Sequence, residues 1–148
     1  MDDRLLLGIE LNCKRDIVRA RQRSRQLAGL LGYSWTERLL ISTRVFQIGW
    51  DLWKRFQRGA VRFQIASGSL LVLAGTSPTS ATEVSLCQPL PSDAPLDAAD
   101  IQFAMKQLID HTPFNLFEEI YAHNEQMNRL LQSVARVSSA RSAMHSAA

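Results

Sequence analysis

Glycine is scarce in this chain, and it is missing after residue 75. There are seven glycines in 148 residues, and the last of them is Gly75. No aspartate is followed by glycine anywhere in the sequence. A loop that binds phosphate groups depends on backbone N–H groups, and glycines allow these N–H groups to come within hydrogen-bond distance of the phosphate oxygens. The sequence therefore excludes a glycine-rich nucleotide loop beyond Gly75.

Cysteine is rarer still. The chain has two, Cys13 and Cys87, which stand far apart with no histidine or cysteine at a zinc-binding spacing. A structural zinc site needs four ligands in close pairs. We therefore expect no metal site, and we interpret both cysteines as small, half-buried residues on strands.

Long apolar runs are also missing. The longest strongly apolar run, Leu70 to Ala74, is far shorter than the ~20 residues that span a bilayer. The chain opens with Met1, Asp2 and Asp3, which are acidic where a signal peptide would be basic. We therefore expect a cytoplasmic protein that does not associate with membranes.

Charge is divided unevenly along the chain. Residues 1–66 carry 13 Lys and Arg against 6 Asp and Glu, a net charge of +7, and residues 67–148 carry 4 against 8, a net charge of −4. A run of arginines at helical spacing can indicate nucleic-acid binding. No helix-turn-helix signature or aromatic platform accompanies it, so we expect a solvated helix face and no nucleic-acid partner. The arginines are Arg15, Arg19, Arg21, Arg23 and Arg25.

Alternation and helical periodicity predict an α+β domain over residues 1–87. We expect Ser67 and Gly68 to form a hairpin turn, and the side chains of Val84 and Leu86 to point inward from the last strand. Asp16 is the predicted N-cap of the first helix. The expected fold is two helices packed on one face of a mixed, mainly antiparallel four-stranded sheet. The predicted strands cover residues 5–12, 59–66, 69–74 and 82–87, and the predicted helices cover 17–31 and 37–56.

Beyond a proline-rich linker at residues 88–96, the chain is predicted to be helical over 97–138. A first helix ends near Asp110, and Thr112 and Pro113 start a second, giving a helical hairpin or coiled coil. Apolar residues in the second helix recur at alternating spacings of 4 and 3, which predicts a dimerisation seam. The tail, residues 139–148, is predicted to be disordered. The seam residues are Leu116, Ile120, His123, Met127, Leu130, Val134 and Val137.

Three short stretches in the first half resemble a known family. They are DIVRARQ (16–22), LAGLLGYS (27–34) and ISTRV (41–45). In this order and spacing they resemble the opening of anti-sigma serine kinases, which belong to the GHKL superfamily and share the Bergerat ATP-binding fold with histidine kinases. The resemblance covers roughly residues 5–66. A weaker one, over residues 113–127, is to the segment that follows the ATPase domain in larger members.

The sequence departs from the family where the family binds ATP. The resemblance puts Gln47 and Asp51 at the positions of the N-box glutamate and asparagine. Glutamine cannot accept a proton as a general base, although Asp51 can still hold Mg²⁺ through a carboxylate oxygen. The D-x-G-x-G box and the glycine-rich lid have no counterpart. The resemblance therefore implies no catalytic residue and no bound cofactor.

These departures favour a non-catalytic, pseudokinase-like module of bacterial signal transduction that acts by protein–protein binding. The seam predicts a homodimer, and the resemblance implies a STAS-type antagonist, a sigma factor or a kinase as partner. Trp50 and Trp53 either fill volume left by the lost pocket or form an exposed anchor for that partner. The alternative function is a divergent ATP-dependent serine or histidine kinase, which would need ATP and Mg²⁺. A purely structural oligomerisation unit is a third hypothesis.

Overall fold

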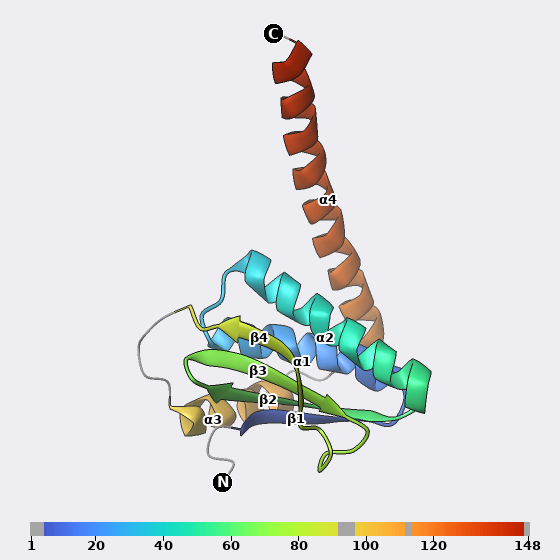
Figure 1. Cartoon of the computed structure of the whole chain (residues 1–148), viewed down its shortest axis with the longest axis vertical. Coiled ribbons are helices and arrows are strands. Elements are labelled where there is room, and N and C mark those ends of the chain that lie inside the picture. The colour runs from blue at the N-terminus through green and yellow to red at the C-terminus, as the bar shows by residue number, and fades with distance from the viewer. Residues whose placement is uncertain (1–4, 92–96, 112–113, 147–148) are drawn as a thin grey trace. The chain divides into compact units, whose positions relative to one another are not determined.

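The computed structural model describes residues 5–91, 97–111 and 114–146, with side chains up to residue 136 (Figure 1). The chain divides into two compact units, Met1–Phe114 and Asn115–Ala148. The first contains an α+β core, as the sequence predicts. Its elements are β1 (Leu5–Leu11), α1 (Lys14–Leu30), α2 (Trp35–Phe56), β2 (Gly59–Ala66), β3 (Ser69–Gly75), β4 (Glu83–Pro89) and α3 (Ala98–His111). The second unit contains α4 (Leu116–Ser146).

The four strands form one sheet in the order β1-β2-β3-β4. Every neighbouring pair of strands is antiparallel. The sequence predicts a mixed, mainly antiparallel sheet, and the observed sheet is antiparallel throughout its four strands. Ser67 and Gly68 both adopt positive φ, 53° and 74°, and form the predicted hairpin turn. Within β3 the pairing with β4 shifts between Val72 and Leu73. This irregularity turns Val84 outward, where its side chain is 53% exposed, so the prediction that it points inward is wrong.

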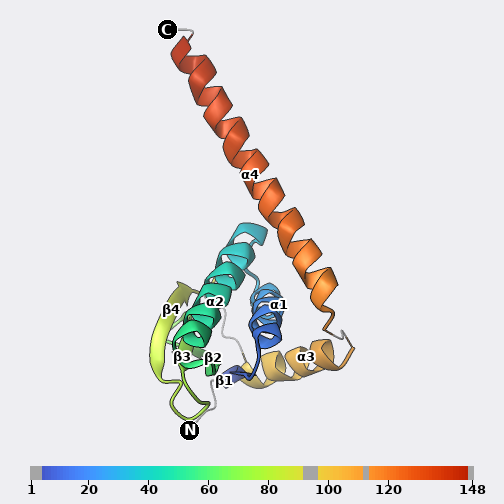
Figure 2. The same ribbon diagram turned by 90° about the vertical axis from the view of Figure 1, so that its right-hand side faces the viewer.

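Helices α1 and α2 cover one face of the sheet (Figure 2). Apolar residues from both helices and from all four strands form a single cluster between the layers. The helices approach closely at Gly49, where an added Cβ would lie 3.2 Å from Cγ2 of Ile17. The largest fully buried side chain is Phe63, at the centre of β2. Burial of such side chains supplies the main stabilisation of the fold.

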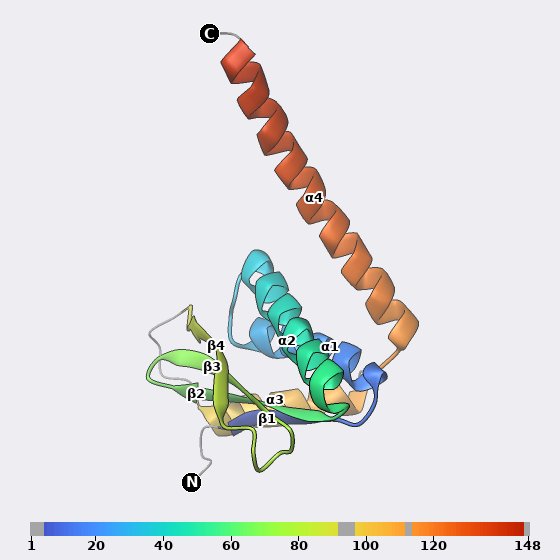
Figure 3. The same ribbon diagram turned by 45° about the vertical axis from the view of Figure 1, so that its right-hand side comes forward.

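Helix α3 belongs to the first unit. It packs against α1 and β1 (Figures 2 and 3), and Met105 is 1% exposed. The side-chain amide of Gln102 donates a hydrogen bond to the backbone carbonyl of Leu5. The first unit therefore extends past the predicted boundary at residue 87, because the apolar face of α3 is buried against the edge of the sheet.

The last strand also runs further than predicted. Pro89 pairs with Ser69, and the backbone N–H of Leu90 donates to the carbonyl of Gly68. Residues 88 and 89 are thus strand rather than linker. Of the predicted linker, residues 92–96 lie outside the described residues, as do Thr112 and Pro113.

The second unit is a helix of 31 residues, α4. Asn115 caps it, since its side-chain oxygen accepts from the backbone N–H groups of Phe117 and Glu118. The helix continues to Ser146, past residue 138, where the sequence predicts its end. The last seam residue, Val137, is helical, but its side chain lies outside the described part. No helix among residues 5–91, 97–111 and 114–146 is long and apolar enough to cross a bilayer.

Candidate functional site

A groove of about 630 Å³ lies between the second half of α2 and the adjoining ends of β3 and β4. Helix α2 contributes Arg44, Asp51 and Arg55, and β4 contributes Glu83. Basic and acidic side chains are therefore mixed along its walls. Polar residues of the loop that joins β3 to β4 (Thr76, Ser80 and Thr82) also line it, together with apolar side chains of α2 (Ile48, Leu52 and Phe56).

Of the two positions that the resemblance assigns to the N-box, one lies at this groove. Asp51 lines it, with a side chain that is 64% exposed and 3.9 Å from the ammonium group of Lys54. Gln47 is exposed on α2 and is not among the lining residues. The glutamine therefore contributes nothing to this groove, and a metal ion here would find a single α2 carboxylate.

Three backbone N–H groups of the β3–β4 loop donate hydrogen bonds within the loop itself. The amide of Ser77 donates to Oγ of Ser80, 2.9 Å away, and the amide of Ser80 donates to Oγ and to the carbonyl of Ser77. The amide of Thr82 donates to the carbonyl of Ser80. Phosphate-binding loops instead direct such amides at the ligand. These three amides are engaged within the loop.

Gly75, the last glycine, serves this turn rather than a ligand. A Cβ at this position would overlap the carbonyl group of Ser80, so the loop closes directly over it. Ala81, in the same loop, is fully buried. The loop is therefore a packed connection between two strands.

The two tryptophans suggested as a partner surface lie on α2. Trp50 is 37% exposed, and the ammonium group of Lys14 lies 5.8 Å from the centroid of its ring. Trp53 is half-buried. Neither residue is among those that line the groove. Trp50 thus offers part of an aromatic surface beside a positive charge.

The arginines of α1 are not a uniformly solvated face. Arg21 and Arg23 are 4% and 5% exposed, which contradicts the prediction from sequence. The guanidinium of Arg21 lies 5.1 Å from the ring centroid of Phe46 on α2. Helix α1 is therefore enclosed on more sides than its apolar stripe indicates.

Arg15 and Arg19 gather at a second pocket, of about 570 Å³, beside the start of α1. Both guanidiniums lie over the ring of Phe114, with centroid distances of 5.3 and 5.4 Å. Nothing in the sequence pairs Phe114 with these residues, because it lies about a hundred positions further along the chain. Only the packing of α3 beside α1 brings them together.

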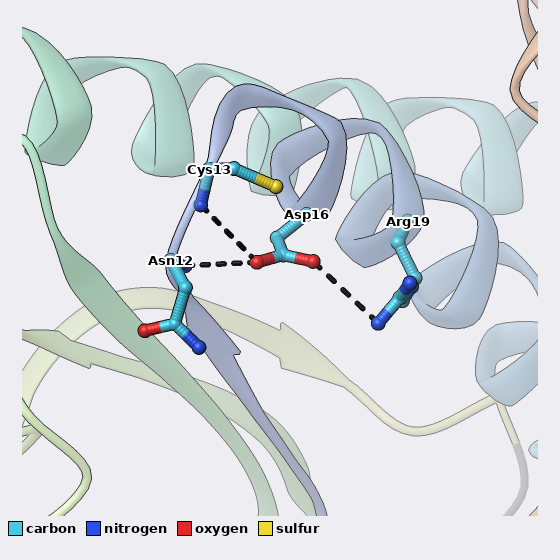
Figure 4. Close-up of polar contacts among 4 residues, drawn as sticks. All are labelled: Asn12, Cys13, Asp16 and Arg19. Carbon is cyan, nitrogen blue, oxygen red and sulfur yellow. Dashed lines mark hydrogen bonds and ion pairs between the residues drawn. The ribbon is translucent and has the colours of Figure 1, made fainter.

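Asp16 organises the same region (Figure 4). Its Oδ2 accepts from the backbone N–H groups of Asn12, at 2.8 Å, and Cys13, at 3.2 Å, and its Oδ1 lies 3.5 Å from Nη1 of Arg19. The helix begins at Lys14, so Asp16 lies in its first turn rather than at the predicted N-cap. A carboxylate there is favoured because it satisfies free amides and complements the helix dipole.

Both cysteines are exposed free thiols, so the prediction of half-buried residues is wrong. Cys13 immediately precedes α1, and Cys87 is on β4. Within the described ranges, no three His, Cys, Asp or Glu side chains cluster closely enough to hold a metal ion.

Searches against protein-family models, curated proteins and solved structures found no match to this chain.

Proposed function

We propose that this chain is a non-catalytic regulatory module of bacterial signal transduction, related to the GHKL ATPases, that binds other proteins and associates with itself. The resemblance implies two consecutive helices within residues 5–66, and α1 and α2 are consecutive helices in that range. Fold alone does not decide function. The proposal therefore depends on the groove beside α2.

The observation that carries it is the hydrogen bonding of the β3–β4 loop. A triphosphate needs several backbone amides or cations directed at its oxygens. The amides of Ser77, Ser80 and Thr82 donate within the loop instead. The groove also has two carboxylates, Asp51 and Glu83, which offset the positive charge of Arg44 and Arg55. These features favour a groove that does not hold ATP.

Calorimetric titration of the full chain with Mg-ATP tests this part of the proposal. We expect no heat of binding at micromolar nucleotide. Micromolar affinity that is lost in Asp51→Ala and kept in Gln47→Ala would establish the alternative, a divergent ATP-dependent serine or histidine kinase. Gln47 is the matched control, because it is on the same helix but outside the groove lining.

The proposed homodimer rests on α4. A lone helix cannot bury an apolar stripe, and heptad-spaced stripes associate in pairs. We expect Leu130→Lys, on the seam, to convert a dimer to a monomer in sedimentation analysis. Gln132→Lys adds the same charge away from the seam and is expected to leave the dimer intact. A wild-type chain that sediments as a monomer at 100 μM would contradict this part of the proposal.

The partner class follows from the resemblance: a STAS-type antagonist, a sigma factor or a kinase in the cytoplasm. Trp50 and the adjacent Lys14 form the surface that we assign to the contact. Half-exposed aromatic side chains are frequent anchors at interfaces. Trp50→Ala is expected to weaken partner capture at least tenfold without changing self-association.

A further inference from the structure

The pocket beside α1 contains three arginines and an aromatic ring, none of which has a role in the proposed function. Two arginines one helical turn apart, Arg15 and Arg19, extend over a single aromatic ring, that of Phe114. A third, Arg23, lines the same pocket and is 5% exposed. Guanidinium groups keep their charge at any pH a cell reaches. Positive charge is thus concentrated in one pocket.

The negative charge nearby only partly offsets it. One oxygen of Asp16 is occupied by the amides of Asn12 and Cys13, and the other faces Arg19 at 3.5 Å. The other carboxylate of the lining, Glu10, is exposed. Arg15 has no ion pair with a described residue, and its guanidinium lies over the ring of Phe114. The two amides that Asp16 accepts from belong to Asn12 and Cys13, which precede α1, so we assign the affinity of this pocket to its arginine side chains and not to the helix terminus.

We propose that this pocket binds a phosphoryl dianion, either inorganic phosphate or a phosphomonoester, with Arg15 and Arg19 as the ligating residues. A planar guanidinium presents paired N–H donors that match two phosphoryl oxygens. Stacking on Phe114 holds both side chains in place, which lowers the rotamer entropy that binding would otherwise remove. A dianion is preferred because it reduces the repulsion between two neighbouring cations.

This inference is independent of the pseudokinase proposal, since the α1 pocket and the α2 groove share no lining residue. A terminal phosphomonoester carries close to two charges at neutral pH, whereas each phosphodiester of a nucleic acid carries one. The pocket is therefore matched to a monoester. Binding of nucleic acid at the same arginines is the competing outcome of the test.

The test measures dissociation constants for the full chain at fixed ionic strength, with inorganic phosphate, a phosphoserine peptide, its unphosphorylated form and a single-stranded oligonucleotide as probes. We expect inorganic phosphate and the phosphoserine peptide to bind, and the unphosphorylated peptide not to bind. Tighter binding of the peptide than of inorganic phosphate would identify a phosphorylated protein as the source. Tighter binding of inorganic phosphate would identify the free ion.

Matched variants locate the site. The double variant Arg15→Gln, Arg19→Gln is expected to lose at least tenfold in affinity for the phosphoryl probe. Arg44→Gln with Arg55→Gln removes the same charge from the α2 groove and is expected to keep wild-type affinity. Arg15→Lys with Arg19→Lys preserves net charge, and is expected to lose affinity because lysine lacks the paired donors.

Three results would overturn the inference. One is an equal loss in the α1 and α2 double variants, which indicates unspecific charge attraction. Another is unchanged affinity in Arg15→Lys with Arg19→Lys. The third is an oligonucleotide that binds more tightly than the phosphoserine peptide and depends on the same arginines.

Discussion

The hydroxyl group of Tyr33, in the loop between α1 and α2, donates a hydrogen bond to the backbone carbonyl of Gln88 in β4, 3.1 Å away. Tyr33 is 2% exposed, and 55 positions separate the two residues. The bond joins the helical layer to the outermost strand of the sheet.

Removing this hydroxyl is expected to destabilise the first unit. Tyr33→Phe keeps the ring but leaves the carbonyl of Gln88 without its donor, which costs about 1 kcal/mol. Urea unfolding followed by far-UV circular dichroism measures the change. Tyr121→Phe, at an exposed tyrosine on α4, is the matched control and is expected to change the free energy of unfolding by less than about 0.5 kcal/mol.

The same hydroxyl predicts a loss of stability at high pH. Burial, with smaller contributions from Glu37 and Cys87, raises the pKa of Tyr33 from 10.0 to about 12. The folded chain therefore keeps a proton that the unfolded chain releases between these values. This contribution to stability is complete below pH 10 and disappears as the pH rises through 12.

Unfolding free energies measured at intervals from pH 9 to 12 test this sign. We expect a fall of about 2 kcal/mol that is absent from the Tyr33→Phe variant. Other groups titrate in the same range, so the difference between wild type and variant is the decisive quantity. A constant difference across the range would contradict the assignment.

The glycine at the end of β3 offers a steric test of the loop. In Gly75→Ala the new methyl group would overlap the carbonyl of Ser80, which is backbone and cannot rotate away. We expect a loss of about 2 kcal/mol, in the range of overpacked sites. Gly8→Ala is the control, because no heavy atom lies within 4 Å of the added Cβ. That variant is expected to be neutral or slightly stabilising.

The carboxylate at the start of α1 gives the fourth prediction. Asp16→Ala removes the acceptor for two backbone amides and is expected to cost 1 to 2 kcal/mol, about the cost of losing a helix cap. Asp16→Asn keeps an acceptor oxygen and is expected to lose less. Asp51→Ala, at an exposed carboxylate in the second half of α2, is the control and is expected to have little effect on thermal unfolding.

Local chemistry was sufficient to predict much of the first unit. Alternation predicts the strands, and the Ser67–Gly68 turn follows from residues that tolerate positive φ. Serine is a preferred N-cap residue, and the hydroxyl of Ser34, just before α2, accepts from the amide of Glu37. These features depend only on residues that are close in sequence, so they can be predicted without knowledge of the tertiary structure.

The features that the sequence did not predict depend on contacts between elements that are distant in sequence. The apolar face of α3, built around Met105, is compatible with a helical hairpin or with the sheet edge, and periodicity cannot choose between them. The outward turn of Val84 comes from a register shift between strands, which leaves no local signature. The candidate phosphoryl site was invisible for the same reason, because Phe114 reaches Arg15 only through α3.

The connectivity of the sheet has a consequence for how the protein folds. Strands β2, β3 and β4 follow one another from Gly59 to Pro89, whereas β1 joins β2 only after the chain has closed a loop that contains both α1 and α2. Closing a longer loop costs more chain entropy. We expect the β2–β4 meander to acquire protection from amide hydrogen exchange first during refolding, and the amides of Leu5–Leu11 to become protected last.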